Sequence, residues 1–314
     1  MKIVITGAMG HIGSFVIREL GINFPHSEIV LIDSLMTQRF PSLFNLPDES
    51  KYTFIEGDVN HLDLVSIFSG ASVVIHLAAI TDAESSFDNP EKIEENNYQS
   101  TVSVANACLK TNAALIAISS TSVYGTQEVE VDENCNADQL VPQSPYARIK
   151  LKEESYVSRL HISNGLKCIH CRFGTIYGAS PGMRFHTAVN KFCWQSIMGQ
   201  PITVWKTAFN QYRPYLDLID ASEAIIFIIK NNLFDGQIYN VLTENLRVSD
   251  VVEVLRNYYP ALEINYVESK IMNQLSYKVL DKKFKSQGFE SSGSIKRAIN
   301  ETIDLLRNSN SIYN

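Results

Sequence analysis

The segment TGAMGHIG follows the first apolar run of the chain directly. That run, KIVIT at 2–6, has the length and β-branched content of a buried strand, and the residues after the segment begin an apolar helix face. Gly7, Gly10 and Gly13 stand between the two in GxxGxxG spacing. Glycine lets backbone N–H groups approach a pyrophosphate, and a helix N-terminus adds positive charge. An ordinary strand-to-helix turn can also use three glycines, but placement between strand and helix favours a dinucleotide-binding fold.

Short apolar runs alternate with longer helix-like segments over the first 175 residues. This alternation is typical of βαβ units and a parallel sheet. The expected strands are 2–6, 28–32, 52–56, 72–77, 114–119 and 166–173. Helices are expected to begin near Gly10, Leu62, Pro90 and Ser144. The predicted fold class is α/β, a Rossmann-type doubly wound parallel sheet.

The alternation stops after Tyr177, where a turn-rich segment leads into a smaller, irregular region. We expect a mixed α/β C-terminal lobe there that binds the substrate. The predicted division is an NAD-binding domain at 1–175, a return to its sheet at 212–242, and a substrate lobe at 176–211 and 243–314. The apolar segments YLDLI at 215–219 and IYNVL at 238–242 are the expected returning strands.

The charge and apolar content exclude several classes of protein. A formal net charge of -7 without a basic run argues against nucleic acid as a partner. The longest apolar run, 224–229, is too short to span a bilayer, and a strand at the second residue leaves no room for a signal peptide. Five cysteines suit reduced thiols, and the Cys168/Cys171 pair lies in an expected strand, so no metal site is predicted. We therefore expect a cytoplasmic protein with no membrane association.

Asp33 closes the second expected strand, twenty residues beyond Gly13. A carboxylate at that strand end can accept both ribose hydroxyls of adenosine and would repel a 2′-phosphate. The sequence therefore predicts NAD as the cofactor in preference to NADP, although the nearby cation Arg39 could soften that preference. Asp58, after the third strand, is placed to meet the adenine amino group, whereas His76 is expected to be structural.

Four hydroxyl residues, 119–122, end the strand at 114–119. They are either a solvated turn or the site of chemistry, because ligands bind at strand ends in α/β sheets. Tyr146 and Lys150, about one loop later, stand four residues apart and so share one helix face. An ammonium near a phenol favours the phenolate, which is what a tyrosine needs to act as a base near neutral pH.

In order and spacing, the segments TGAMGHIG, ISSTSVYG, SPYARIK, CRFGTIYG and QYRPYLDLID resemble the extended short-chain dehydrogenase/reductase superfamily. The resemblance runs essentially end to end and is closest to the NAD-dependent nucleotide-sugar epimerase/dehydratase family. It implies that Ser120, Tyr146 and Lys150 are catalytic, with Tyr146 as the base and Lys150 as its partner. It also implies a nucleotide-diphosphate sugar as substrate and, by analogy in the helices at 90–110 and 144–164, a homodimer.

The resemblance also assigns binding roles. The residues expected to contact the cofactor are Gly7, Gly10, His11, Ile12, Gly13, Asp33, Ser34, Asp58, Val59, Leu77, Ala78, Ala79, Asn97, Tyr146, Lys150 and Phe173. Those expected on the substrate side are Ser122, Thr175, Arg184 and Arg213. Arg213 would meet the diphosphate, and Arg184 is either a second phosphate contact or a solvated loop residue. Thr175 and Pro214 depart from the Asn and Asp of the family pattern, which leaves the identity of the sugar open.

The residues beside Ser120 bear on the reaction. Dehydratases of the family carry an Asp-Glu pair where this chain has Thr121 and Ser122, so 4,6-dehydration is disfavoured. A 3,5-epimerase would carry Cys in the place of Ser122. The expected function is an NAD-dependent nucleotide-sugar epimerase acting through a transient 4-keto sugar. The alternatives are a 4-dehydrogenase or 4-ketoreductase and, from a different class, a redox-inactive NAD-binding regulator.

Overall fold

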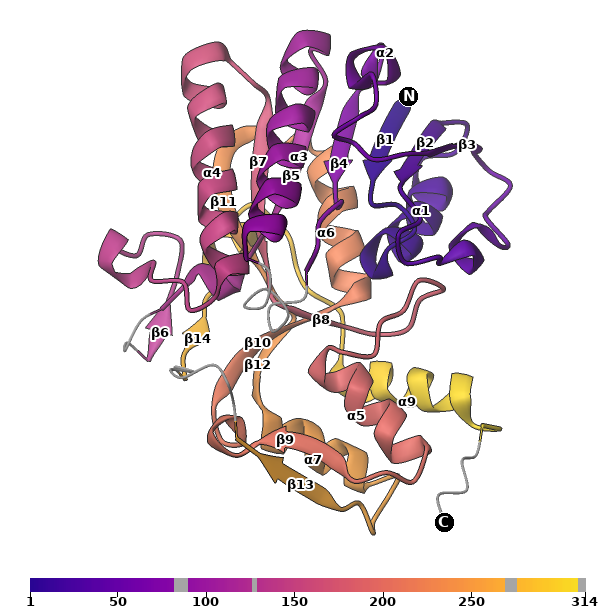
Figure 1. Ribbon diagram of the computed structural model, residues 1–314, viewed down its shortest axis with the longest axis vertical. Coiled ribbons are helices and arrows are strands. Elements are labelled where there is room, and N and C mark those ends of the chain that lie inside the picture. Colours follow the sequence, from indigo (N-terminus) through magenta and orange to yellow (C-terminus); the bar gives the residue numbers. More distant parts are fainter. Residues whose placement is uncertain (82–89, 126–128, 269–275, 310–314) are drawn as a thin grey trace.

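The computed structural model describes residues 1–81, 90–125, 129–268 and 276–309. Its main element is a seven-stranded parallel sheet in the order β11-β7-β5-β4-β1-β2-β3 (Figure 1). The strands of this sheet are β1 (Lys2–Thr6), β2 (Glu28–Asp33), β3 (Lys51–Glu56), β4 (Val73–His76), β5 (Ala114–Ser120), β7 (Cys168–Phe173) and β11 (Asp235–Val241). The predicted α/β fold with a doubly wound parallel sheet is confirmed.

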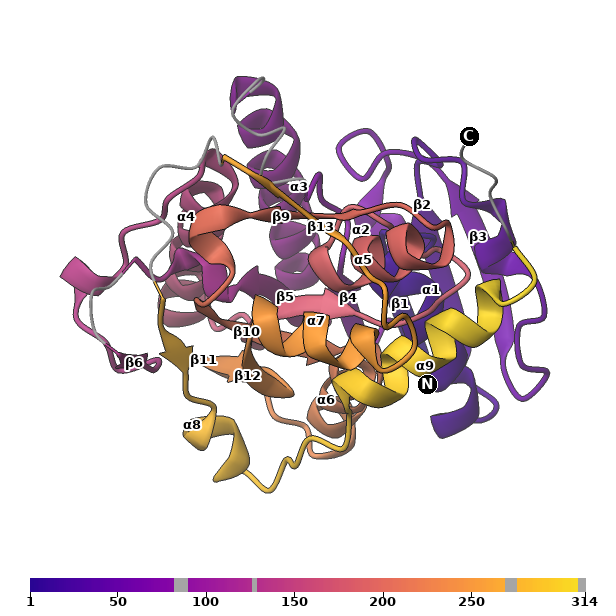
Figure 2. The ribbon, with the colours of Figure 1, turned by 90° about the horizontal axis from the view of Figure 1, so that it is seen from below.

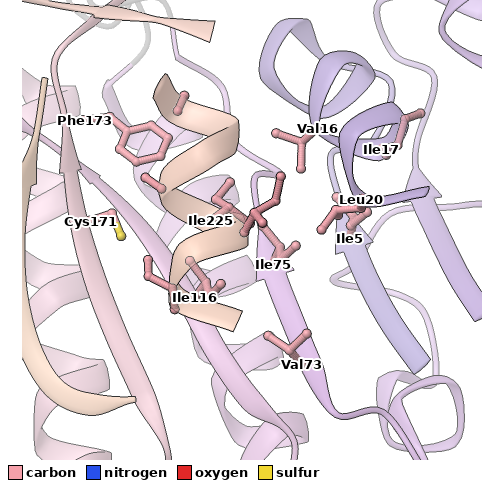
Figure 3. Close-up of a cluster of buried hydrophobic side chains, with 14 of the residues drawn as sticks. Ile5, Val16, Ile17, Leu20, Val73, Ile75, Ile116, Cys171, Phe173 and Ile225 are labelled. Carbon is pink, nitrogen blue, oxygen red and sulfur yellow. The ribbon is translucent and has the colours of Figure 1, made fainter. Parts of the chain in front are cut away.

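Helices cover both faces of the sheet, because successive strand residues point to opposite sides. On one face, α1 (His11–Asn23) and α6 (Leu218–Lys230) pack on the cluster that contains Ile5, Ile75 and Ile116 (Figure 3). On the other face, α2 (Leu64–Phe68), α3 (Pro90–Thr111) and α4 (Pro145–Asn164) pack on a cluster that contains Val4 and Val74. The main core is therefore a three-layer α/β/α sandwich.

A smaller lobe lies below the main sheet in Figure 1 and in front of it in Figure 2, which views the molecule from below. Its strands are β8 (Thr175–Tyr177), β10 (Tyr212–Asp217) and β12 (Glu244–Arg247) in one sheet, and β9 (Ile202–Trp205) with β13 (Ile264–Val267) in another. Its helices are α5 (Ala188–Ile197), α7 (Val248–Arg256) and α9 (Ile295–Leu306), which share one apolar core. A third small pair joins β6 (Glu130–Val131) to β14 (Lys278–Val279), followed by the short helix α8 (Lys282–Lys285).

The expected return to the main sheet occurs at one strand and not at the other. β11 pairs in parallel with β7 at the edge of the seven-stranded sheet. β10 was expected there too, but it pairs with β8 and β12 in the lobe instead. The prediction for the first of the two segments was wrong because an apolar run shows burial without showing which sheet provides the partner strand. The division of the chain into two domains stays a prediction.

The start of α4 is fixed by its own sequence. The Ser144 hydroxyl accepts a hydrogen bond from the backbone N–H of Ala147 at 3.2 Å, and Pro145 occupies the first helical turn. The helix ends at Gly165, whose φ of 72° lies in the left-handed region that glycine tolerates. These signals place Tyr146 in the first turn of α4, beside the end of β5.

The parallel register brings the carboxyl ends of the strands to one edge. Thr6 of β1 pairs with Ile32 of β2 and His76 of β4, and Ser120 of β5 pairs with Phe173 of β7. Ligands of open α/β sheets bind outside this edge. Among the described residues, no helix combines the length and apolar character needed to cross a bilayer.

Candidate active site

The glycine turn after β1 is packed too tightly for side chains at two positions. Gly7 has a φ of +70°, and a Cβ there would lie 2.6 Å from the backbone nitrogen of Ala78. A Cβ on Gly13 would lie 2.4 Å from the carbonyl oxygen of Gly7. The turn therefore runs against the end of β4 and passes directly into α1, whose first N–H groups face the carboxyl edge of the sheet. This geometry suits a pyrophosphate.

Asp33 is held rigidly at the end of β2. Its Oδ2 accepts a hydrogen bond from the backbone N–H of Met9 at 2.9 Å, and its Oδ1 accepts one from Leu35 at 2.8 Å. The carboxylate thus bridges the glycine turn and the loop after β2. Arg39 lies within electrostatic range: burial lowers the pKa of its guanidinium, and Asp33 opposes that change.

The other predicted cofactor residues lie along the same edge. Asp58 is partly exposed and accepts a hydrogen bond from the backbone N–H of Asn60 at 2.9 Å, while Ser34 is exposed and Val59 is buried. The Asn97 amide makes two hydrogen bonds of 2.8 Å with the backbone of Ile80, which fixes the chain beyond β4. Leu77, Ala78 and Ala79 precede that clamp, and Phe173 is buried at the end of β7.

A loop that leads into the smaller lobe packs on the glycine turn, and the sequence did not predict this contact. The carbonyl of Gly178 lies 2.9 Å from Nε2 of His11, and the Ser180 hydroxyl donates to the His11 carbonyl at 2.9 Å. The backbone N–H of Gly182 donates to the Ser14 hydroxyl at 2.9 Å. Burial lowers the pKa of His11 to about 4, so the imidazole is neutral at pH 7. The GASPG turn signal in 178–182 predicts a loop but not where it docks.

The four hydroxyls at the end of β5 separate into two pairs. Ser119 donates to Glu154 at 2.5 Å and Thr121 donates to the carbonyl of Phe173 at 3.2 Å, so both have structural partners. Ser122 donates to the Ser120 hydroxyl at 2.9 Å, and both line the cavity described below. Ser120 and Ser122 therefore form a hydrogen-bonded pair of hydroxyls at the cavity.

Tyr146 and Lys150 lie on one face of α4, as the spacing predicted. The Lys150 Nζ atom is 5.8 Å from the centroid of the Tyr146 ring. Burial raises the pKa of the Tyr146 phenol, and Lys150 and Arg184 both oppose that rise. The two cations favour the phenolate, but burial outweighs them and the pKa of Tyr146 stays above its ordinary value. Neither Tyr146 nor Lys150 is among the residues that line the cavity described below.

A buried ion pair fixes α4 to the sheet behind the site. Arg172 of β7 donates from Nε and Nη2 to the Glu154 carboxylate at 2.9 and 2.7 Å. Its Nη1 donates to the Tyr124 hydroxyl at 2.9 Å, and Tyr124 donates to Asn240 of β11 at 2.8 Å. With the Ser119 bond to Glu154, this network joins α4 to β5, β7 and β11.

A cavity of about 620 Å³ opens between the carboxyl edge of the sheet and the lobe. This size is ordinary for a small-molecule site. Its described lining contains three cationic side chains, Arg184, Lys191 and Arg213, and no Asp or Glu. Aromatic side chains add apolar surface: Tyr124, Phe185, Phe192, Trp205, Tyr215 and Tyr277. The cavity therefore combines a positive field with surfaces on which a flat ring can stack.

The cations reach the cavity from different elements of the lobe. Arg213 of β10 donates to the Tyr212 carbonyl and to Gln211 Oε1, each at 2.8 Å, and burial lowers the pKa of its guanidinium. Arg184 contacts the Thr81 hydroxyl, and Lys191 lies on α5. Thr175 also lines this cavity. The sequence predicted Arg184 and Arg213 but not Lys191, since a lone lysine on a helix gives no signal.

Two other predictions concern buried side chains. His76 is buried, with Nδ1 2.7 Å from the Thr6 hydroxyl and Nε2 3.2 Å from the Thr101 hydroxyl. Cys168 and Cys171 are free and buried in β7, where burial raises the pKa of both thiols. Among the described residues, no cluster of three or more His, Cys, Asp or Glu could hold a metal ion.

The parallel sheet, the glycine turn and the carboxylate at the end of β2 define a dinucleotide-binding enzyme of the Rossmann class. Residues 3–241 match the model of the NAD dependent epimerase/dehydratase family. The chain belongs to this family, and the resemblance inferred from its motifs is confirmed.

Relatives with known or proposed activities cover the chain to different extents. It is 30% identical over 96% of its length to a trifunctional UDP-glucose 4,6-dehydratase/UDP-4-keto-6-deoxy-D-glucose 3,5-epimerase/UDP-4-keto-L-rhamnose-reductase of Arabidopsis thaliana. The match covers 46% of that protein, so the chain spans less than half the length of this relative. It is also 30% identical over 77% of its length to the uncharacterized UDP-glucose epimerase YtcB of Bacillus subtilis, of which 76% is covered.

Solved structures with the same fold include both epimerases and dehydratases. The UDP-glucuronic acid 4-epimerase from Bacillus cereus, in complex with UDP-glucuronic acid and NAD, superposes with a TM-score of 0.87 at 23% identity, over 98% of this chain and 99% of that one. A dTDP-glucose 4,6-dehydratase from Streptomyces venezuelae also gives a TM-score of 0.87, at 21% identity over 98% of both chains. These likenesses show the fold.

NAD is the cofactor of this family, and the residues at the carboxyl edge fit it. The glycine turn leaves no room for a Cβ at Gly7 or Gly13, so backbone alone meets the ligand there. Asp33 presents a carboxylate whose position is fixed by two backbone N–H groups. The turn would hold the pyrophosphate, and Asp33 would hold the adenosine ribose.

The fixed carboxylate of Asp33 predicts the choice of cofactor. We expect the chain to bind NAD⁺ at least tenfold more tightly than NADP⁺, because a 2′-phosphate would meet an anion that cannot turn away. Titration of both cofactors against tryptophan fluorescence or by calorimetry measures the ratio. Asp33→Asn should reduce the ratio of the two affinities, because it removes the repulsion between the carboxylate and the 2′-phosphate. Tighter binding of NADP⁺ by the unmodified chain would show that Arg39 dominates instead.

Proposed function

We propose that this enzyme is a nucleotide-sugar 4-epimerase that works through a transient 4-keto sugar. The observation that carries the proposal is the cavity lining: three cations and no Asp or Glu among its described residues, beside the paired hydroxyls of Ser120 and Ser122. The cations suit a diphosphate, and the aromatic side chains suit a base and a sugar. The names of YtcB, an uncharacterized UDP-glucose epimerase, and of the Bacillus cereus UDP-glucuronic acid 4-epimerase support an epimerase.

The residues at the strand ends supply the proton chemistry. In the proposed reaction, Ser120 hydrogen-bonds the C4 oxygen and Tyr146, as phenolate, takes the C4 hydroxyl proton. Lys150 stabilises the phenolate and would hold the nicotinamide ribose. NAD⁺, when bound, would supply the acceptor for the C4 hydride and would return that hydride to C4. The 4-keto sugar then rotates in the cavity, so that the hydride returns to its opposite face. Tyr146 gives its proton back to the C4 oxygen, and the configuration at C4 is inverted.

Dehydration needs further acid and base groups. A 4,6-dehydratase must remove the C5 proton and expel the C6 hydroxyl as water, yet Thr121 and Ser122 provide only hydroxyls. Thr121 also donates its hydroxyl to the Phe173 carbonyl, so its proton is already engaged. Epimerisation at C4 needs only one base, which in the proposed reaction is Tyr146 in the first turn of α4, two residues after the cavity-lining Ser144. A 4-dehydrogenase or 4-ketoreductase would use the same residues and is the second candidate.

A substrate panel tests the proposal. Incubation with UDP-glucose, UDP-glucuronic acid, UDP-N-acetylglucosamine and dTDP-glucose, in the presence of NAD⁺, should give the C4 epimer of at least one of them. Absorbance at about 340 nm should show no net NADH, because the hydride returns. Net NADH equal to the substrate consumed would favour the dehydrogenase. No reaction across the panel, with NAD⁺ bound, would favour the regulator.

We propose further that the enzyme is a cytoplasmic homodimer. Its five cysteines are all free, which suits a reducing compartment. α3 and α4 pack side by side and present their outer surfaces to solvent, including Ile162 at 81% exposure. A pair of such helices can complete a four-helix interface with a second copy. Light scattering coupled to size exclusion should give about twice the chain mass.

A further inference from the structure

A second buried ion pair lies on α4, one turn beyond Tyr146. The Lys150 Nζ atom donates to Glu153 Oε2 at 2.8 Å and to the carbonyl of Ile118 in β5 at 3.1 Å. The side chains of Lys150 and Glu153 are each 7% exposed. A buried cation and anion hold each other because neither can regain its hydration without moving. Lys150 is therefore fixed between α4 and β5 by Glu153.

Among the charged groups around the pair, Glu153 is the carboxylate that contacts Lys150. The titratable and charged side chains that face Lys150, Glu153 or Tyr146 are His76 of β4, Glu154 of α4, His170 and Arg172 of β7, and Arg184 after β8. Burial lowers the pKa of His76 to about 3 and of His170 to about 4, so both are neutral at pH 7. Glu154 is engaged by Arg172. Burial raises the pKa of Glu153, and Lys150 and Thr101 of α3 oppose that rise.

The charge of Glu153 acts on the phenol through the same pair. Burial alone would lower the pKa of Lys150, but Glu153 reverses this change and keeps the ammonium charged. A carboxylate 2.8 Å from the ammonium also cancels part of its field at a distance. Burial raises the pKa of Tyr146, Lys150 opposes the rise, and Glu153 adds to it. Glu153 thus fixes the place of Lys150 and limits its effect on Tyr146.

We propose that Glu153 is a positioning residue for the Tyr146–Lys150 pair, which anchors the ammonium of Lys150 and weakens its field at the Tyr146 oxygen. The inference rests on the proposed function, in which Tyr146 is the base. It assigns a role to a buried acid that touches neither the cavity nor the cofactor residues of the glycine turn. Glu153 acts on Tyr146 by positioning Lys150 and by the charge of its own carboxylate.

Titration of Tyr146 tests this role without any sugar. The NAD⁺-loaded protein is labelled with [¹³Cζ]tyrosine, and the Tyr146 resonance is assigned by its loss in Tyr146→Phe. Glu153→Gln keeps the shape of the side chain, and its amide oxygen can still accept the hydrogen bond from Lys150 Nζ. The ammonium then stays in place, while the carboxylate charge that offsets its field at the phenol is gone. We expect the pH of Tyr146 ionisation to fall by about half a unit or more. Because no sugar is used, this titration tests the role of Glu153 even if the proposed epimerase reaction is not found.

A graded variant and a matched control complete the test. Glu153→Asp keeps the charge but retracts it from Lys150, so its ionisation pH should lie between those of the unmodified chain and Glu153→Gln. If Glu153→Gln does not fold, Glu153→Asp alone tests the proposal. Glu94→Gln removes the exposed ion pair between Glu94 and Lys152 of α4 and should leave the titration unchanged. An ionisation pH that stays the same or rises in both Glu153 variants would overturn the proposal.

Discussion

Tyr146→Phe is expected to lower kcat by about 10²- to 10⁴-fold, the usual contribution of a positioned general base. The substitution removes the phenolic oxygen and leaves the ring, which is held in the first turn of α4. The affinity for NAD⁺ should be largely unchanged, because the glycine turn and Asp33 are untouched. Steady-state assays on the nucleotide sugar that the panel identifies, with a parallel NAD⁺ titration, measure both quantities.

Tyr156→Phe is the matched control for this loss. Tyr156 lies on the same helix, and its hydroxyl accepts a hydrogen bond from Asn106 of α3 at 2.8 Å, away from the cavity. Its phenol oxygen therefore serves packing, so kcat should change little. Comparable turnover in the unmodified chain and in Tyr146→Phe would remove Tyr146 as the base.

Glu154→Gln is expected to lower the free energy of unfolding by about 3–5 kcal/mol. Arg172 would keep its charge in a buried site, and a neutral amide cannot match the two hydrogen bonds of 2.9 and 2.7 Å that the carboxylate accepts. Urea unfolding followed by circular dichroism measures the loss. Because the network joins α4 to three strands, the whole urea unfolding transition should shift to lower urea concentration as a single step.

The exposed ion pair between Glu94 and Lys152 gives the comparison. Both of its side chains are about half exposed, at 47% and 55%, and such pairs contribute about 0–1 kcal/mol. Glu94→Gln should therefore shift the urea midpoint only slightly. Equal losses in the two variants would show that burial of the Arg172–Glu154 pair adds nothing to stability.

The main sheet could be predicted from the sequence because its strands are buried on both faces. Such strands are short apolar runs separated by helices, and the glycine turn fixes where the first βα unit begins. The lobe could not be predicted in the same detail. β10 reads as a core strand, but its partners β8 and β12 are four residues or fewer, too short to show a pattern.

The site divides in the same way. Asp33 could be named because it closes a recognisable strand after the glycine turn. Ser120, Tyr146 and Lys150 could be named because the segments ISSTSVYG and SPYARIK resemble those of the family. Lys191 and the loop at 178–182 could not, since their positions depend on how the lobe docks on the sheet. Glu153 and Glu154 stand side by side in one helix with nothing in the sequence to separate them. The fold gives them different partners, Lys150 and Arg172.

The position of deuterium in the product tests the central proposal most directly. The reaction is run in D₂O with the active sugar of the panel, and the product is read by ¹H NMR. A 4-epimerase moves the C4 hydrogen as hydride and returns it, so the product should be inverted at C4 and carry no deuterium on carbon. A 4-keto-6-deoxy product with deuterium at C5, where a solvent proton replaces the one removed, would instead show dehydration and contradict the proposed function.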